Sequence, residues 1–430
     1  MGGMFETLRN AWKIPDLRKK ILFTVAMLII YRIGGHIPVP FLDADEFRNL
    51  VKSGGALFGM FDIITGGAFQ LATIFAMSIT PYINSSIIMN LLTVAIPALE
   101  RLQKEGEEGR KIIAQYTRYG TVVLGFLQAV GLYIGLGGAV VGGRNWLSFL
   151  TITLTFTAGT AFLMWLGEQI TEYGIGNGIS LIIFAGIVSR GPAGAATLIN
   201  YYTGGQLGSG IIGILAIIGI LVVFIAVIAL VIWVNQAERR IPVQYAKRVV
   251  GRKVYGGQST HIPIKVNLAG VIPIIFAMSI TMFPSQMITF FAPKSENPIL
   301  LWLKNSTDSI WYSLIYALLI MFFTFFYTVI QFNPIEIANN MKKNGGFIPG
   351  IRPGKPTSDY VSKVLNRITW FGGLFLAVIT VVPTIVGSIL QVKGLFFGGT
   401  ALLILVGVAI DTVKQIESQM LMRHYKGFLE

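Results

Sequence analysis

The sequence contains no cysteine and little charge. The absence of cysteine among its 430 residues excludes disulfides, thiolate catalysis, and zinc–thiolate or iron–sulfur sites. Only 13% of the residues are charged and 53% are hydrophobic, whereas a soluble domain usually carries about 25% charge. A chain with so few charges cannot cover a water-facing surface, so most of its exterior must face lipid. The composition therefore predicts a polytopic membrane protein.

Motifs for metal and nucleotide binding are also missing. The three histidines form no HxxxH or HExxH pair, since His36, His261 and His424 lie far apart. The stretch GGFIPGIRPGKPT (345–357) has the look of a phosphate-binding loop, but Pro349 stands where GxxxxGK requires its first glycine. No GxSxG nucleophile elbow is present. We therefore predict no catalytic residue, no metal site and no cofactor, and the chain is not expected to be an enzyme.

Apolar stretches recur along the chain at a length of about 20 residues, which is what crossing about 30 Å of hydrocarbon requires. No small-x-small cleavage site follows the first stretch, so we expect it to remain as a span rather than to be a cleaved signal peptide. The sequence thus predicts an all-α membrane protein. Its ten transmembrane helices are expected at roughly 20–37, 70–92, 117–137, 147–166, 178–198, 211–234, 268–290, 309–331, 368–387 and 399–417.

Lysine and arginine set the expected orientation of these spans. They outnumber Asp and Glu by 34 to 20. Most of them lie in the segments that share one side of the membrane with the N-terminus, above all in the loops 235–265 and 332–367. By the positive-inside rule, both loops and both termini are expected in the cytoplasm. Ten spans divide into two sets of five, and two repeats with an odd number of spans insert in opposite orientations. The halves 1–198 and 199–430 are therefore expected to form an inverted pair.

The apolar cores of the second to tenth spans contain almost no charge. Arg118 lies at a cytoplasmic end, and Asp411 lies in the last third of the tenth span. Ion-coupled transporters and pumps usually require buried acids or bases, so this absence disfavours them. A ten-span secondary transporter of a neutral solute remains an alternative. A membrane-embedded enzyme would need a polar catalytic cluster inside the spans, and none is visible.

A short apolar segment lies between the first two spans. Its apolar part, 56–65, is bracketed by glycine pairs and is about ten residues long, which is too short to cross the membrane. It suits either a helix lying at the membrane surface or a re-entrant plug. A re-entrant segment would imply a water-filled cavity, because non-helical backbone at membrane depth must be satisfied by protein or water.

Isoleucines recur at helical spacing in several spans. Two pairs are separated by four residues, which places each pair on one helix face. The ordinary interpretation is packing or lipid contact, and the alternative is a hydrophobic constriction that closes a pore by excluding water. The isoleucines concerned are Ile83, Ile87, Ile179, Ile183, Ile275 and Ile404.

Small polar residues interrupt the second, third and seventh spans. Such groups usually form hydrogen bonds between neighbouring helices, at modest energies. They are expected either to join helices or to mark a weakly held seam that can open. The residues concerned include Asn90, Gln128, Ser279 and Thr281.

The loop 332–367 has the composition of a shaped surface loop. Pro349 and Pro353 restrict the backbone on either side of Arg352, while Gly350 and Gly354 permit a tight turn. A stiffened loop with an arginine at its tip suits docking to an acidic or phosphate-rich partner. The alternative is that its positive charge serves only to fix the orientation of the spans.

Characteristic strings recur in order along nearly the whole chain. They are HIPVP (36–40), ITPYINSSII (79–88), QYTRYGT (115–121), WLGEQITEYGIGNGIS (165–180), PIKVNLAGVIPIIFA (263–277), NPIEIANNMKKNGGFIPGIRPGKPT (333–357) and GGTALLILVGVAIDT (398–412). Taken together and in register, these strings resemble the SecY family of protein-conducting channels in its bacterial form. The outside segments 137–146 and 199–210 and the stretch 291–308 match no string of that family.

The resemblance implies a clamshell of two pseudo-symmetric five-helix halves around a central pore. The six isoleucines would form the pore ring, and the four polar residues named above would lie at a lateral gate between spans two and three and spans seven and eight. The plug helix would occupy about 56–66. Its side chains would be Leu57, Phe58, Met60, Phe61, Ile63 and Ile64.

The resemblance also implies function and partners. The channel would pass unfolded secretory polypeptides across the bacterial plasma membrane and release signal sequences and transmembrane segments sideways into lipid. SecE-type and SecG-type small subunits would accompany it, and the SecA motor ATPase or ribosomes would dock on the cytoplasmic loops. The basic residues expected to serve docking are Arg239, Arg240, Lys247, Arg248, Lys342, Lys343, Arg352 and Lys355.

Overall fold

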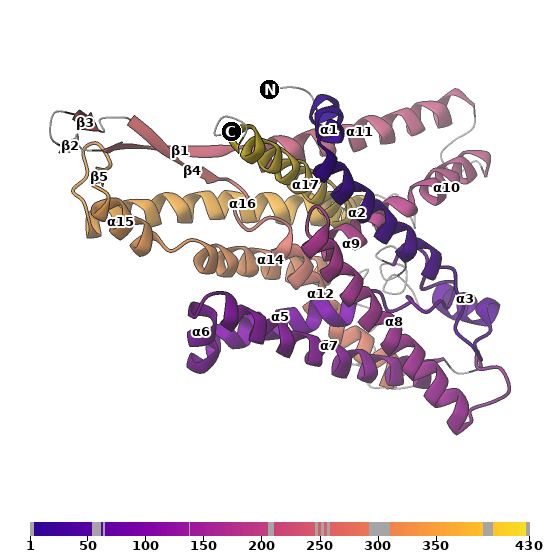
Figure 1. The fold of residues 1–430 in the computed structure, drawn as a ribbon. Coiled ribbons are helices and arrows are strands. Elements are labelled where there is room, and N and C mark those ends of the chain that lie inside the picture. The colour runs from indigo at the N-terminus through magenta and orange to yellow at the C-terminus, as the bar shows by residue number, and fades with distance from the viewer. Residues whose placement is uncertain are drawn as a thin grey trace.

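The protein is described by a computed structural model, which covers residues 4–53, 62, 65–136, 138–204, 210–245, 248–250, 253–255, 259–291, 310–389 and 399–426. Long helices make up most of it, and a pair of strands extends from one end of the helix bundle (Figure 1). Two groups of helices diverge toward that end, one formed by α5, α6 and α7 and the other by α14, α15 and α16 (Figure 1).

The first half of the chain, up to α10, is helical with irregular connections. Its helices are α1 (Met4–Lys13), α2 (Pro15–Gly34), α3 (Ala44–Ser53), α5 (Thr80–Ala95), α6 (Pro97–Lys104), α7 (Glu107–Gly135), α8 (Trp146–Tyr173), α9 (Gly178–Ser189) and α10 (Gly191–Thr203). Since α10 continues to Thr203, the helical part of this half ends later than the expected boundary at residue 198.

The second half, from α11 onward, adds strands to the helices. The helices are α11 (Ile211–Gln236), α12 (Ile272–Phe291), α14 (Ile310–Gln331), α15 (Pro334–Lys343), α16 (Lys355–Ile389) and α17 (Gly399–Lys426). The strands are β1 (Glu238–Tyr245), β2 (Arg248–Val250), β3 (Lys253–Tyr255), β4 (Ser259–Lys265) and β5 (Gly346–Phe347).

Each of the ten expected spans overlaps a helix. By length and hydropathy, six helical stretches of the described chain can cross a membrane, or seven if the bent pair α5–α6 forms one span. Among the remaining spans, α2 and α7 include charged residues, and the apolar part of α12 is short. The most apolar is α11, with a mean hydropathy of 3.5 and 6% of its span buried inside the protein. Most of its surface is therefore free to face lipid or another membrane helix.

The second expected span differs from the prediction in its first half. Residues 65–79 form turns, and the helix α5 begins only at Thr80. The irregular backbone finds partners in the segment after α2: Val39 N–H donates to the Ala72 carbonyl at 2.9 Å, and Ile74 N–H donates to the Ile37 carbonyl at 3.0 Å. Hydropathy is the same for an apolar helix and an apolar loop, so the sequence could not distinguish them.

Close packing holds this irregular segment inside the first half. The ring of Phe75 stacks between Tyr31 of α2 and Phe162 of α8, with centroid distances of 6.2 and 5.9 Å. A Cβ atom at Gly159 of α8 would collide with the carbonyl of Ile74. Glycine at this position therefore lets α8 approach the loop backbone directly.

The two large basic loops fold together into one small body. Strands β4, β1 and β5 form an antiparallel sheet in that order. A separate hydrophobic cluster holds the sheet against α15 and the start of α16: Ile241, Val243, Ile264, Met341, Ile348, Val361 and Leu365. The prediction of a purely helical chain missed this sheet, although the alternation of buried Ile241 and Val243 in β1 is the period of a strand.

Both ends of the described chain lie on the same side of the bundle. Helix α1 packs against α17. Ala11, Leu17, Ile175 and Ile416 join them through a small buried cluster. This arrangement fits an even number of membrane crossings between α1 and the end of α17.

A candidate pore and its seam

Several helix pairs join the two halves, among them α5 with α12, α7 with α12, and α9 with α17. The six isoleucines lie on the first and third of these pairs. Ile83 and Ile87 lie on α5, Ile179 and Ile183 on α9, Ile275 on α12 and Ile404 on α17. The pairs thus bring the isoleucines from opposite halves of the chain together.

All six isoleucines belong to one hydrophobic cluster. The four most buried are Ile83, Ile87, Ile183 and Ile404, while Ile179 and Ile275 are half-buried against the cluster. Ordinary packing of a bundle also produces such a cluster, so the pore-lining role of these side chains stays a prediction.

The glycine-rich turn before α9 positions its isoleucines. Gly176 has a φ of +86°, which favours glycine, and the Asn177 side chain accepts a hydrogen bond from Ser180 N–H at 3.1 Å as the helix cap. A Cβ at Gly178 would collide with the carbonyl of Gly167 on α8. The motif YGIGNGIS therefore has a structural purpose: it starts a helix in direct backbone contact with α8, with Ile179 and Ile183 one turn apart.

Helix α12 is held differently on its two sides. Toward α14, in its own half, Phe276 makes edge-to-face contacts with Phe323 and Tyr327, at centroid distances of 5.7 and 5.1 Å. Such aromatic pairs add about 0.5–1.5 kcal/mol each to the burial of their surface. Toward α5 and α7, in the other half, α12 makes a packing contact. Pro284 inside α12 also removes one hydrogen bond of the helix backbone.

The polar residues predicted for the gate contribute little to joining α12 with α5 and α7, the contact that is called the seam below. Asn90 bonds to Ser86 of its own helix at 3.5 Å, and the Thr281 hydroxyl donates to the Ala277 carbonyl of its own helix. Gln128 is buried on α7, and its amide nitrogen has no hydrogen-bond partner among the residues described. Ser279 is buried on α12. For the first three residues, no hydrogen bond to a neighbouring helix is present among the described residues, and their place at a gate stays a prediction.

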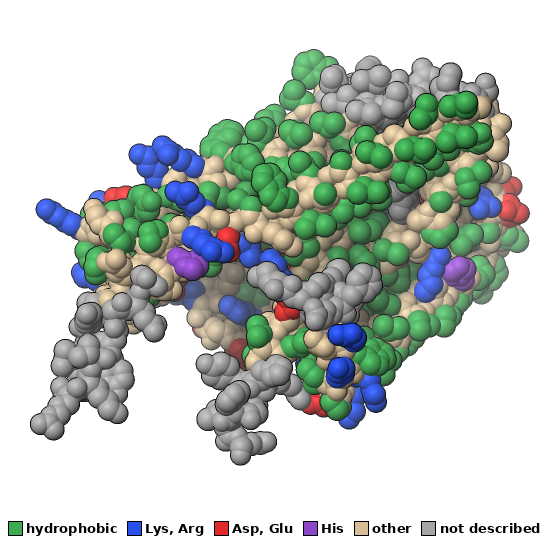
Figure 2. All heavy atoms as spheres, turned by 90° about the horizontal axis from the view of Figure 1, so that it is seen from above, with side chains coloured by type: hydrophobic (Ala, Val, Ile, Leu, Met, Phe, Trp, Pro, Cys, Tyr) green, Lys and Arg blue, Asp and Glu red, His purple; other side chains and the backbone are tan. Residues whose placement is uncertain are grey.

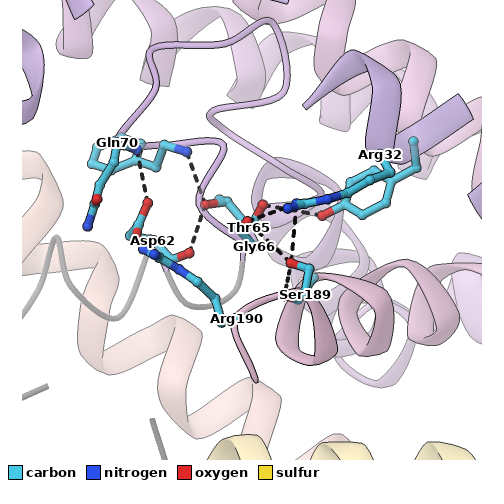
Figure 3. A network of polar contacts seen from close by, with 10 residues as sticks. Arg32, Asp62, Thr65, Gly66, Gln70, Ser189 and Arg190 are labelled. Carbon is cyan, nitrogen blue, oxygen red and sulfur yellow. Dashed lines mark hydrogen bonds and ion pairs between the residues drawn. The ribbon is translucent and has the colours of Figure 1, made fainter. Parts of the chain in front are cut away.

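The six predicted plug side chains, at 57, 58, 60, 61, 63 and 64, lie outside the described residues. Described residues that flank them are inside the protein, since Asp62 and Thr65 are each 1% exposed. Sequence reasoning missed Asp62, although a single acid in an apolar, glycine-bracketed segment is itself unusual. Its surroundings form the polar network in Figure 3.

The basic docking residues lie mostly on the body formed by the two large loops. Arg239 and Arg240 are exposed on β1, where Arg240 Nε donates to Glu238 Oε1 at 2.7 Å. Lys342 and Lys343 are exposed at the end of α15. Residue 247 lies outside the described chain, and Arg248 is described by its backbone alone, in β2. Figure 2 shows hydrophobic side chains over the middle of one face and most lysines and arginines toward its ends.

Arg352 sits at an ordered tip. Gly350 and Gly354 have φ values of +80° and +100°, which glycine adopts freely. The Thr357 hydroxyl donates to the Arg352 carbonyl at 2.9 Å, fixing the backbone, while the Arg352 side chain is exposed. Lys355, the first residue of α16, is exposed beside it. The loop thus presents its charge to solvent in a defined position.

The SecY family model matches residues 73–413 of the chain. The chain belongs to the SecY family. It is 47% identical to the protein translocase subunit SecY of Halalkalibacterium halodurans, over 99% of this chain and all of that one. It is 45% identical to the protein of the same name from Thermotoga maritima, over 99% of this chain and 98% of that one.

Solved structures share the fold at lower identity. A structure described as a protein-conducting channel covers 94% of this chain and 92% of its own, at a TM-score of 0.65 and 20% identity. Sec61 in the canine ribosome–channel complex covers the same shares, at a TM-score of 0.62 and 18% identity. The protein is therefore a multi-pass membrane protein with the ten-helix clamshell of this family. Together the comparisons support a protein-conducting channel and give no support to a solute carrier.

Replacing two of the ring isoleucines should open a path for ions. We expect Ile87→Ser with Ile404→Ser to raise the resting ion conductance of the purified protein in planar bilayers severalfold, because hydroxyls let water enter an apolar constriction. Ile88 is 46% exposed and adjacent on α5, so Ile88→Ser is the matched control and should leave the conductance unchanged. Equal conductance of the folded double variant and the wild type would contradict the ring.

Proposed function

We propose that this protein passes unfolded secretory polypeptides across the membrane and releases signal sequences and transmembrane segments sideways into lipid. The observation that carries the proposal is the junction of the two halves. There the six isoleucines belong to one hydrophobic cluster. At the seam, the contact of α12 with α5 and α7, Asn90 and Thr281 bond within their own helices, and the Gln128 amide nitrogen has no partner among the residues described.

The physical requirements of the task match this junction. A polypeptide must cross without a leak of ions, and an apolar ring excludes water while offering a passing chain no strong contact. Hydrophobic segments must leave toward lipid, which transfer of apolar surface drives. A seam held by packing can part for this purpose, whereas the aromatic contacts keep α12 attached to α14.

The remaining roles follow the resemblance in the sequence. We assign the plug to about 56–66, and the buried position of Asp62 and Thr65 supports a plug inside the bundle. The protein would reside in the bacterial plasma membrane with both termini in the cytoplasm. The contact of α1 with α17 supports placing both ends on one side.

Partners would supply the work and complete the assembly. SecE-type and SecG-type subunits would add membrane helices, and the exposed surface of α11 offers room for such contacts. The body built from β1, β4, α15 and the Arg352 tip would receive the SecA motor ATPase or a ribosome. The likeness to Sec61 in a ribosome–channel complex is consistent with ribosome docking.

Locking the seam should stop transport. The chain has no cysteine of its own, so Asn90→Cys on α5 and Ser279→Cys on α12 can be bridged with a short bifunctional maleimide. We expect bridging to abolish precursor translocation into vesicles, because a signal sequence could no longer part the helices. Each single variant treated in the same way is the control. Full translocation with the bridge quantitatively formed would refute the gate.

Charge reversal at Arg352 should weaken the docking of the motor ATPase on the cytoplasmic loops. Arg352→Glu should lose a charge-assisted contact of about 1.5–3 kcal/mol, or one to two decades in motor affinity. Lysine should rescue only in part, because an ammonium cannot make a planar two-pronged contact. The measurement is ATP-driven precursor translocation, with Lys363→Glu on the exposed face of α16 as the matched control. Wild-type rates for Arg352→Glu would show that the arginine serves topology alone.

A further inference from the structure

Asp62 is a buried carboxylate in a chain whose spans contain almost no charge. It is 1% exposed and forms an ion pair with Arg190, at the junction of α9 and α10. The same residue organises the turn that follows it. Its Oδ1 accepts a hydrogen bond from Gln70 N–H at 2.9 Å, and its carbonyl accepts one from Gly67 N–H at 2.9 Å.

The end of α2 provides a second set of contacts to the turn that follows Asp62. Arg32 Nη1 donates to the Gly66 carbonyl at 3.0 Å and to the Ser189 hydroxyl at 3.2 Å. Beside it, the Tyr31 hydroxyl donates to the Thr65 carbonyl at 3.3 Å. Figure 3 shows Arg32 and Arg190 approaching the turn between Asp62 and Gln70 from different helices. The turn is therefore held by the ends of α2 and α9 together.

The two glycines of this turn allow the approach. Gly66 and Gly67 have φ values of +65° and +93°. A Cβ at Gly66 would collide with the backbone of Gly186 and the hydroxyl of Ser189 in α9. A Cβ at Gly67 would lie 3.7 Å from Nε of Arg190. The glycine pair thus lets the turn lie directly against the end of α9. It also places Gly67 next to Arg190, whose guanidinium pairs with Asp62.

The charges around Asp62 are unbalanced. Arg190 lies within electrostatic reach of Arg32 and Arg48 as well as beside Asp62. Asp62 is the buried member of the pair, whereas 21% of the Arg190 side chain is exposed and Arg32 and Arg48 are exposed. Loss of the carboxylate would leave the Arg190 guanidinium without its partner and near other guanidinium groups, a repulsion that water screens in part.

We propose that Asp62 and Arg190 form an ionic anchor that fixes the base of the plug to α9 and sets how readily the channel opens. The proposal rests on the proposed channel function and adds a specificity-determining pair to it. A signal sequence that displaces the plug must work against this anchor, with Arg32 as its second attachment. The strength of the anchor then decides how hydrophobic a signal must be to open the channel.

Neutralising the carboxylate should favour the open state. We expect Asp62→Asn to raise the open fraction by roughly one order of magnitude, because it leaves the partly exposed Arg190 without its partner. The readouts are resting ion conductance in planar bilayers and translocation of a precursor whose signal sequence has been weakened. Asp45→Asn is the matched control, since Asp45 is an exposed acid of α3, and it should behave as wild type.

A double-mutant cycle separates an ion pair from a general defect. Arg190→Gln should raise conductance in the same direction, and the double variant Asp62→Asn with Arg190→Gln should leak less than the product of the two single effects. Ser189→Ala removes only one partner of Arg32 and should give a smaller rise. If Asp62→Asn fails to fold while the double variant folds, that outcome also supports the pair, because the second change removes the unpaired charge.

The outcomes distinguish this proposal from the channel function itself. If wild-type protein translocates the precursor but the Asp62, Arg190 and Ser189 variants all show wild-type conductance and signal dependence, the anchor is wrong. Strictly multiplicative effects in the cycle would also overturn it, because independent residues behave in that way. If wild-type protein with its partners translocates no precursor, the proposed function fails, whatever the variants do.

Discussion

The packing of α12 against α5 and α7 is the contact on which the proposed mechanism depends. It joins the two halves, yet Asn90 and Thr281 bond within their own helices, and the Gln128 amide nitrogen has no hydrogen-bond partner among the described residues. On its other side α12 is attached to α14 through Phe276. In the proposed mechanism the contact of α12 with α5 and α7 is the boundary that parts. In that mechanism the isoleucine ring lies beside this boundary, so parting it would connect the pore with lipid.

The first half contains backbone that is not helical, and the structure satisfies that backbone internally. The turns at 65–79 bond to the chain after α2, and Gly159 lets α8 contact them directly. Charged groups hold this segment: the buried Asp62 pairs with the partly exposed Arg190, and the exposed Arg32 bonds to the Gly66 carbonyl. The first half therefore combines an apolar interior with one concentrated polar site. In the proposed mechanism, that site determines how easily the resting state is left.

The sequence predicted the spans because hydrophobic length is a local property, and helical spacing predicted that Ile83 and Ile87 share a face. It did not reveal the sheet of β1, β4 and β5, since the alternating pattern is short and its strands come from two separate loops. It gave no sign of the pair Asp62–Arg190, because pairing between residues far apart in the chain is set by the fold. The start of α5 at Thr80 was missed for a different reason, since apolar turns and apolar helices have the same hydropathy.

The most direct test of the account is to locate a polypeptide in transit. A photoreactive residue can replace Ile404 on α17, and in a separate variant the exposed Ile88 on α5, in vesicles that contain a precursor stalled by a folded domain at its end. The account predicts that the stalled chain cross-links from position 404 and not from position 88, and only when the motor and ATP are present. Cross-linking of the chain from position 88 alone, or from neither position during active transport, would contradict it.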